Sequence, residues 1–267
     1  MLVAAYRARA SARPSPVCND PWASRLAGVE GEELARRYDQ GFPSAELWVA
    51  VRTAFFDREI RRLTGEAKAG QVVVLGAGFD TRAVRLAGSG VRWFEVDRLE
   101  SQEEKLRRLG ALADYPRQAA TFVSCDFEKE DFLDRLAAAG FRAEEPAIFL
   151  WEGVTLYLPE AAVRTTLRNI ARRCHARTVV LFDYIGKKMG DREVRSAGDL
   201  AIHAVSVEVG EPIVFGSNDL LPLLYEEGYR FVHTLSFDEA TLDLTGTYDR
   251  ARMFRFQRLA LCSRTAP

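Results

Sequence analysis

The feature that most constrains this sequence is the regular alternation of short apolar runs and helix-like segments between residues 71 and 185. Each run is rich in Val, Leu, Ile and Phe, as expected of a strand that is buried on both faces. Such alternation predicts βαβ units with right-handed crossovers, and therefore a doubly wound α/β fold with a parallel sheet. The five predicted strands are QVVVL (71–75), VRWFEVD (91–97), TFVSCDF (121–127), AIFLWEG (147–153) and TVVLFDYI (178–185).

The last part of the chain departs from this rhythm. FVHTLSF (231–237) and ARMFRFQRLALCS (251–263) also have the character of strands, but only a turn-rich loop is predicted between them. Two strands joined without a helix predict an antiparallel hairpin at one edge of the sheet. The complete prediction is a Rossmann-like, seven-stranded, mostly parallel sheet.

The whole chain, residues 1–267, is predicted to be one domain, because no repeat and no low-complexity linker divides it. We distinguish four parts within it. They are a helical cap that begins with a proline-containing loop (1–70), a cofactor-binding core (71–186), a lid or substrate-facing insertion (187–217), and a C-terminal helix and hairpin (218–267).

Charge and cysteine content disfavour several classes of function. With 37 basic and 38 acidic residues the formal net charge is −1, which provides no general attraction for nucleic acid or an anionic membrane. The four cysteines and three histidines are scattered and have no metal-binding spacing, so no metal is predicted. The sequence predicts neither a signal peptide nor a membrane span. We therefore expect a cytoplasmic protein that acts on a small molecule.

Candidate binding residues lie where the predicted strands end, because open α/β sheets bind ligands beyond the carboxyl ends of their strands. The first strand ends in Gly76-Ala77-Gly78, whose glycines permit a tight turn and a close approach to a ligand. The second ends in Asp97, a position from which a carboxylate can accept hydrogen bonds from ribose hydroxyls. Glu95, two residues earlier, is the alternative for that role.

The third and fourth strands end in further polar residues. Asp126 can pair with an adenine amino group while Phe127 packs on the base, and Glu152 ends the fourth strand. The glycine turn, GAGFDT (76–81), lacks the third glycine of a dinucleotide motif, and its Asp80 would lie near a pyrophosphate. The pattern therefore disfavours NAD or FAD and favours a cofactor whose amino-acid end carries an ammonium group.

Four segments in this order resemble the leucine carboxyl methyltransferase family: QVVVLGAGFDTRAVRL (71–86), FEVD (94–97), DF (126–127) and WEGVTLYLPEAAV (151–163). CNDPWASRLAG (18–28), AVRTAFFDREI (50–60) and GEPIVFG (210–216) are also similar to family segments. The resemblance covers roughly residues 5 to 260 and implies a methyltransferase whose cofactor is S-adenosyl-L-methionine, converted to S-adenosyl-L-homocysteine. It also implies roles for individual residues. Arg52 would bind the methionine carboxylate, and Glu152 would lie at the ammonium side of the cofactor. The turn at the cofactor would be formed by Gly76, Ala77 and Gly78. Asp97 would bind the ribose, and Asp126 and Phe127 would bind the adenine.

The family transfers methyl groups to oxygen, typically of a carboxylate, and the shorter chain resembles bacterial members that esterify secondary metabolites. A carboxylate is ionised near pH 7, since its ordinary pKa is about 4, and needs no general base. A phenol or alcohol acceptor would need one, for which His203 is the candidate. Tyr157, Tyr184 and Arg195 are further candidates for substrate contact.

Three alternatives remain open. The first, within the same class, is methylation of a protein's C-terminal carboxylate. The second is a nicotinamide-dependent oxidoreductase, although neither its glycine motif nor a convincing catalytic pair is present. The third is a binding protein that kept the fold without catalysis.

Overall fold

The structure is a computed structural model that describes residues 1–39, 44–66, 68–88, 90–127, 129–187, 204, 206–207, 212–247 and 256–267. Its seven-stranded sheet has the order β3-β2-β1-β4-β5-β7-β6. All neighbouring strands from β3 to β5 are parallel, whereas β7 is antiparallel to both β5 and β6. The predicted doubly wound, mostly parallel sheet is therefore confirmed. Its strands are β1 (Gln71–Leu75), β2 (Arg92–Asp97), β3 (Thr121–Ser124), β4 (Ala147–Trp151), β5 (Val179–Ile185), β6 (Phe231–Ser236) and β7 (Gln257–Ser263).

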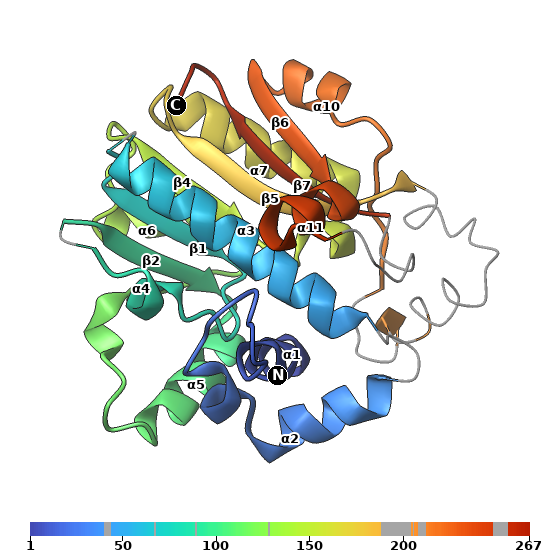
Figure 1. Cartoon of the computed structure of the whole chain (residues 1–267). Helices are drawn as coiled ribbons and strands as arrows, with labels where there is room; N and C mark the ends of the chain where they lie inside the picture. The colour runs from blue at the N-terminus through green and yellow to red at the C-terminus, as the bar shows by residue number, and fades with distance from the viewer. Residues whose placement is uncertain are drawn as a thin grey trace.

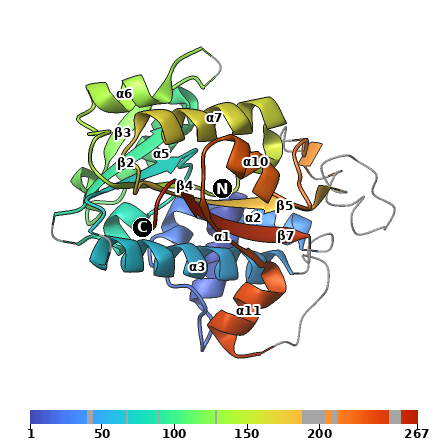
Figure 2. The same cartoon turned by 90° about the horizontal axis from the view of Figure 1, so that it is seen from above.

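Helices cover both faces of this sheet (Figures 1 and 2). The long helix α3 (Ala45–Gly65) and α11 (Phe237–Thr245) lie on one face, and α6 (Phe132–Ala138), α7 (Glu160–Arg173) and α10 (Leu221–Glu226) lie on the other. The structure also describes the helices α1 (Leu2–Ser11), α2 (Ala23–Tyr38), α4 (Arg82–Arg85) and α5 (Leu99–Gly110) and the short 3₁₀ turns η1 (Arg117–Ala119) and η2 (Thr155–Tyr157).

The central strands are largely apolar because each contributes to two cores. In β1, Val72 and Val74 belong to the cluster beneath α3, while Val73 and Leu75 belong to the cluster beneath α6 and α7. Successive side chains of a strand point to opposite faces, so a continuous apolar run fills both layers. This packing holds the carboxyl ends of β1, β2 and β4 in register at one edge of the sheet.

The C-terminal part corrects one detail of the sequence analysis. Strands β6 and β7 are antiparallel neighbours, as predicted, but helix α11 directly follows β6 where a loop of turns was expected. Ser236 and Glu239 cap its first turn reciprocally, and the ring of Phe237 packs 5.5 Å from that of Trp48 on α3. A nine-residue helix with three acids and two threonines has weak intrinsic propensity, so this contact with α3 stabilises it.

The N-terminal part also differs from expectation in its first residues. The chain begins with helix α1, which packs on α2 and α3, and the proline-containing loop follows it. Most of the insertion predicted at 187–217 lies outside the described residues, as do the first residues of the strand predicted at 251–263.

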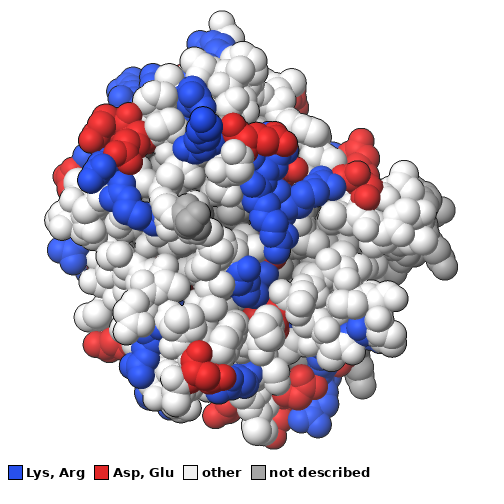
Figure 3. All heavy atoms as spheres, turned by 60° about the vertical axis from the view of Figure 1, so that its left-hand side comes forward, with Lys and Arg blue, Asp and Glu red and all other residues white. Residues whose placement is uncertain are grey.

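The surface carries basic and acidic side chains side by side on the face drawn in Figure 3, in agreement with the net charge of −1. None of the helices in the described ranges is long and apolar enough to cross a membrane. The described residues also contain no group of three His, Cys, Asp or Glu side chains that could hold a metal ion.

Candidate functional site

The two glycines of the turn after β1 are placed in different surroundings. Gly76 and Gly78 both have positive φ angles, of 65° and 46°, which favour glycine. A Cβ on Gly76 would collide with Val154 from the loop after β4, whereas a Cβ on Gly78 would meet nothing within 4 Å. Gly76 is therefore needed for packing, and Gly78 borders open space at the edge of the sheet. Ala77 between them is buried.

Asp97 faces this turn from the end of β2. Its Oδ2 accepts a hydrogen bond of 2.6 Å from the backbone N–H of Gly78, and its Oδ1 accepts one of 2.8 Å from that of Arg98. The side chain is only partly buried. A carboxylate has about four acceptor positions, so each oxygen can still accept a hydroxyl group.

Glu95 is placed differently from Asp97, although both lie on β2. It is 2% exposed and forms a buried ion pair with Lys105 of α5. The Nζ of Lys105 also donates to the carbonyl of Asp80, at 2.6 Å. Burial raises the pKa of Glu95 to about 7, although the positive charge of Lys105 acts to lower it. Of the two acids, Asp97 is therefore the one available to a ligand.

A hollow of about 600 Å³ lies beyond the ends of β2 and β3. Its lining residues come from the end of β3, from the segments that follow β2 and β3, and from α6. They are Arg98, Leu99, Glu100, Ser124, Cys125, Asp126, Glu130 and Arg135. Asp126 forms an ion pair of 2.6 Å with Lys129, and Phe127 is 39% exposed beside it, with its ring 6.2 Å from that of Phe132.

Arg52 points from α3 toward the ends of β4 and β5. It is 6% exposed, with its Nε 2.9 Å from Glu152 Oε1 and its Nη1 2.8 Å from Asp183 Oδ2. Its guanidinium carbon lies 5.4 Å from the ring centre of Trp48, one turn earlier on the helix. Burial disfavours the charged form of Arg52, but the negative charges of Asp183 and Glu152 outweigh this effect and raise the pKa of Arg52 above its ordinary value.

Arg82 of the DTR segment binds three carboxylates. It is fully buried, with Nε 2.6 Å from Asp57 Oδ1 and Nη2 2.6 Å from Glu152 Oε2, and it also pairs with Asp80. Glu152 is therefore shared, one oxygen to Arg52 and the other to Arg82. Despite burial, Arg82 holds the pKa of Asp80 below its ordinary range.

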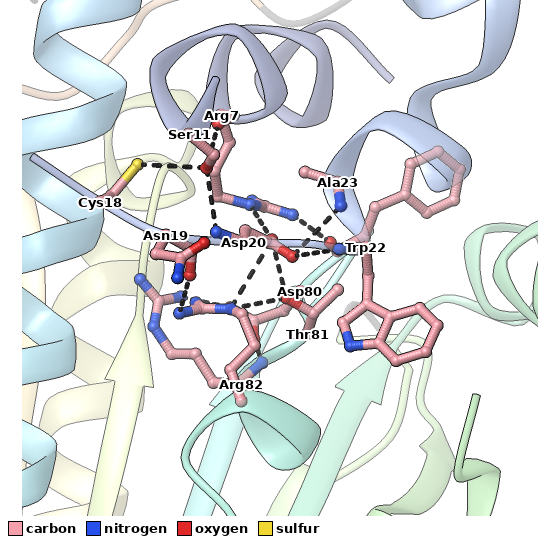
Figure 4. Close-up of polar contacts among 12 residues, drawn as sticks. Arg7, Ser11, Cys18, Asn19, Asp20, Trp22, Ala23, Asp80, Thr81 and Arg82 are labelled. Atoms are coloured by element: carbon pink, nitrogen blue, oxygen red, sulfur yellow. Dashed lines mark hydrogen bonds and ion pairs between the residues drawn. The ribbon is translucent and has the colours of Figure 1, made fainter. Parts of the chain in front are cut away.

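The network extends to the N-terminal segment (Figure 4). Asp57 pairs with Arg85 at 2.5 Å, and Arg85 lies 3.7 Å from Asp20. Asp20 also accepts hydrogen bonds from Arg7 of α1, at 2.5 Å, and from the hydroxyl of Thr81, at 2.7 Å. Arg7 in turn donates to the carbonyl of Phe79 in the glycine turn, at 2.5 Å. The first helix is thereby tied to the turn after β1.

The structure thus brings together most of the predicted site residues. Arg52 contacts Glu152, and Gly78 contacts Asp97, whereas Asp126 and Phe127 lie farther along the edge by the hollow. The binding roles of these residues remain predictions.

The candidate substrate contacts are placed less completely. Tyr157, in η2, is partly buried and lies close enough to Arg52 to contribute to its raised pKa. Tyr184 is buried in the core beneath α7. His203 and Arg195 lie outside the described residues.

Sequence reasoning missed two charged partners of candidate residues, Asp183 beside Arg52 and Lys105 beside Glu95. Asp183 had a usable signal, since a single acid within the apolar run TVVLFDYI requires a buried partner. Lys105 had no such signal, because it lies in a helix whose other side chains are mostly polar and at least partly exposed.

The comparisons with known proteins show the family and the fold. The sequence model of the leucine carboxyl methyltransferase family matches residues 1–171, more than half of the chain. A protein of Mycolicibacterium smegmatis assigned to the S-adenosyl-L-methionine-dependent methyltransferases is 34% identical over 224 residues, which cover 74% of each chain. A second relative so assigned, from Mycolicibacterium vanbaalenii, is 36% identical over 176 residues, which cover 60% of this chain and 57% of the relative.

Among solved structures, a DUF574 family protein of Streptomyces avermitilis has a TM-score of 0.65 at 12% identity, covering 98% of this chain and 97% of the other. At this identity the likeness concerns the fold alone. Together, fold and sequence relatives define an S-adenosyl-L-methionine-dependent methyltransferase. The chain belongs to the leucine carboxyl methyltransferase family.

Proposed function

We propose that this methyltransferase forms methyl esters on small-molecule carboxylates. The observation that carries the proposal is the row of functional groups along one edge of the sheet, from Arg52 and Glu152 through the glycine turn to Asp97 and Asp126. The acceptor class is inferred from the chemistry of this edge.

The residues present fit the cofactor. Gly78 borders open space, and Asp97 beside it keeps acceptor capacity for ribose hydroxyls. The hollow after β2 and β3 has room for a base, with Asp126 and the exposed ring of Phe127 nearby. When bound, S-adenosyl-L-methionine supplies the methyl group as part of a sulfonium.

The buried network also suits a cationic ligand. It joins four arginines to five carboxylates, so that with every group ionised it carries one net negative charge. Its members are Arg7, Arg52, Arg82 and Arg85 with Asp20, Asp57, Asp80, Glu152 and Asp183. In a buried setting, where solvent screening is weak, this charge favours a positively charged group at the ends of β1 and β4.

A carboxylate acceptor is supported by what the described part of the chain, which does not include His203, offers for proton transfer. Such an acceptor is already ionised and needs only to be oriented and stripped of water. Among the described residues, His175 precedes β5 at the opposite edge of the sheet, and His233 lies on the outer strand β6. Neither lies where it could take a proton from an acceptor at the site.

The test uses the stability of the product. The purified chain is incubated with S-adenosyl-L-methionine labelled with tritium in the methyl group and with panels of small carboxylic acids, phenols, and peptides that end in leucine. Methyl esters release labelled methanol in mild alkali, whereas methyl ethers do not. We expect alkali-labile label with small acids, and none when each acid is replaced by its primary amide.

Two outcomes would contradict the acceptor class. Alkali-stable label on a phenol would indicate an ether-forming enzyme, and label confined to peptides would indicate a protein carboxyl methyltransferase. Binding of NADH in place of S-adenosyl-L-homocysteine would contradict the cofactor itself.

A further inference from the structure

Asp183 is an acid inside an otherwise apolar central strand. All seven residues of β5 are buried, and Asp183 has no exposed surface. The last residue pair between β4 and β5 is Trp151 with Phe182, so Asp183 is the next residue along β5. It therefore adjoins the loop that carries Glu152.

Three contacts connect Asp183 to that loop and to α3. Its Oδ2 accepts from Nη1 of Arg52 at 2.8 Å, and its Oδ1 accepts from the backbone N–H of Gly153 at 2.6 Å. Its main-chain carbonyl accepts a hydrogen bond from the hydroxyl of Thr155. One residue thus determines the positions of a guanidinium group and of the backbone beside it.

These contacts determine how Arg52 is oriented. Glu152 holds Nε and Asp183 holds Nη1, which defines the plane of the guanidinium group. The same group lies against Gly153, where a Cβ would stand 3.2 Å from Nη2 and 3.3 Å from Nη1. Gly153 has a φ of 71°. The hydrogen bond that its backbone N–H donates to Asp183 stabilises that turn.

Stability alone does not explain an acid at this position. A buried ion pair is often no more stabilising than apolar side chains of similar volume, because both charges must be desolvated. Among the acids that the structure describes, an apolar residue at 183 would leave Arg52 paired with Glu152 alone, which Arg82 also uses.

We infer that Asp183 is a positioning residue of the cofactor site. It holds Arg52 in the orientation in which its guanidinium group receives the carboxylate of the methionine end of the cofactor. The inference rests on the proposed role of Arg52 in binding that carboxylate. In this role Asp183 acts through its contact with Arg52.

The test compares two ligands that differ only at the amino-acid end. S-adenosyl-L-homocysteine carries the carboxylate and the ammonium group of that end, and 5′-methylthioadenosine lacks both. Calorimetric titration of Asp183→Asn should show a loss of affinity for S-adenosyl-L-homocysteine of about 10-fold or more, with the affinity for 5′-methylthioadenosine changed less than about twofold. Asparagine keeps the shape and an acceptor for Gly153, but loses the charge that orients Arg52.

Two further variants complete the design. Asp243→Asn removes an exposed acid paired with Arg58 on the surface and should leave both affinities unchanged. Arg52→Lys keeps the charge but loses the planar fork, and should reproduce the selective loss of Asp183→Asn. If Asp183→Asn does not fold, Asp183→Glu, which keeps the charge but displaces it, is titrated by the same criterion.

The outcomes separate the inference from its premise. Equal weakening of both ligands, or of neither, in the Asp183 variant would overturn the positioning role. An Arg52→Lys variant with unchanged affinity for S-adenosyl-L-homocysteine would overturn the role of Arg52. A wild-type chain that binds neither ligand would overturn the cofactor assignment.

Discussion

Gly76 and Val154 meet so closely at the end of β1 that a Cβ on Gly76 would lie 2.7 Å from Cγ2 of Val154. This contact joins the turn after β1 to the loop after β4, and it leaves no space for a larger residue. Two residues later, Gly78 has a similar backbone conformation but an open surrounding. The two glycines of one motif therefore have separable roles.

Gly76→Ala is expected to lower the free energy of unfolding by about 2–4 kcal/mol, from the positive φ and the collision with Val154. Gly78→Ala should cost only about 1–2 kcal/mol, from its positive φ alone, but should weaken binding of S-adenosyl-L-homocysteine. Urea unfolding and calorimetry measure both. The double variant Gly76→Ala, Val154→Ala should lose less than the sum of its parts, and strict additivity would contradict the clash.

Asp97→Ala is expected to lower the affinity for S-adenosyl-L-homocysteine by about 10-fold or more, since the ribose hydroxyls lose a charged acceptor. The fold should persist, because Asp97 is only partly buried and its two backbone donors lie at the edge of the sheet. The matched control is Asp114→Ala, which removes an exposed acid paired with Arg25. Equal affinity of wild type and the Asp97 variant would remove this residue from the site.

Glu95 is expected to make stability depend on pH. Its pKa is raised from 4.5 to about 7 by burial, so the folded chain binds this proton more tightly than the unfolded chain. The contribution of Glu95 to the free energy of unfolding is therefore greatest below pH 4.5. It falls as the pH rises to about 7, by about 3 kcal/mol in total. Asp183, whose pKa burial also raises, contributes in the same direction.

The Glu95 contribution can be isolated by comparing variants. Urea unfolding from pH 5 to pH 8 should show this loss in the wild type and a flatter profile in Glu95→Gln, where Asp183 still contributes. Glu103→Gln, which alters an exposed acid on the same helix as Lys105, should follow the wild type. Parallel profiles for wild type and Glu95→Gln would contradict the assignment.

Arg82→Lys is expected to destabilise the chain by about 3–5 kcal/mol, because one ammonium group cannot reach three buried carboxylates from different segments. Arg58→Lys, at an exposed pair with Asp243, should change stability by less than about 1 kcal/mol. Thermal and urea unfolding provide the measurement. A similar small change for both would show that the buried network contributes little.

Much of the fold could be predicted from local pattern. Runs such as QVVVL (71–75) are long enough and apolar enough to predict buried strands, and the spacing between them predicts crossover helices. Helix α11 was missed because its own sequence has weak helix propensity. Its packing against Trp48 provides the additional stabilisation that the helix needs. A contact between residues almost 190 positions apart leaves no periodic signal.

By itself, the sequence determined which residues end the strands, because strand length and glycine placement are local properties. It thereby located Gly76, Gly78, Asp97 and Glu152 at one edge of the sheet. Only the tertiary structure decided their partners: Arg52 meets Glu152 and Asp183, whereas Glu95 is neutralised by Lys105. A buried charge needs a partner of opposite charge, and that partner can lie far away along the chain. Which residues pair therefore depends on how the helices pack on the sheet.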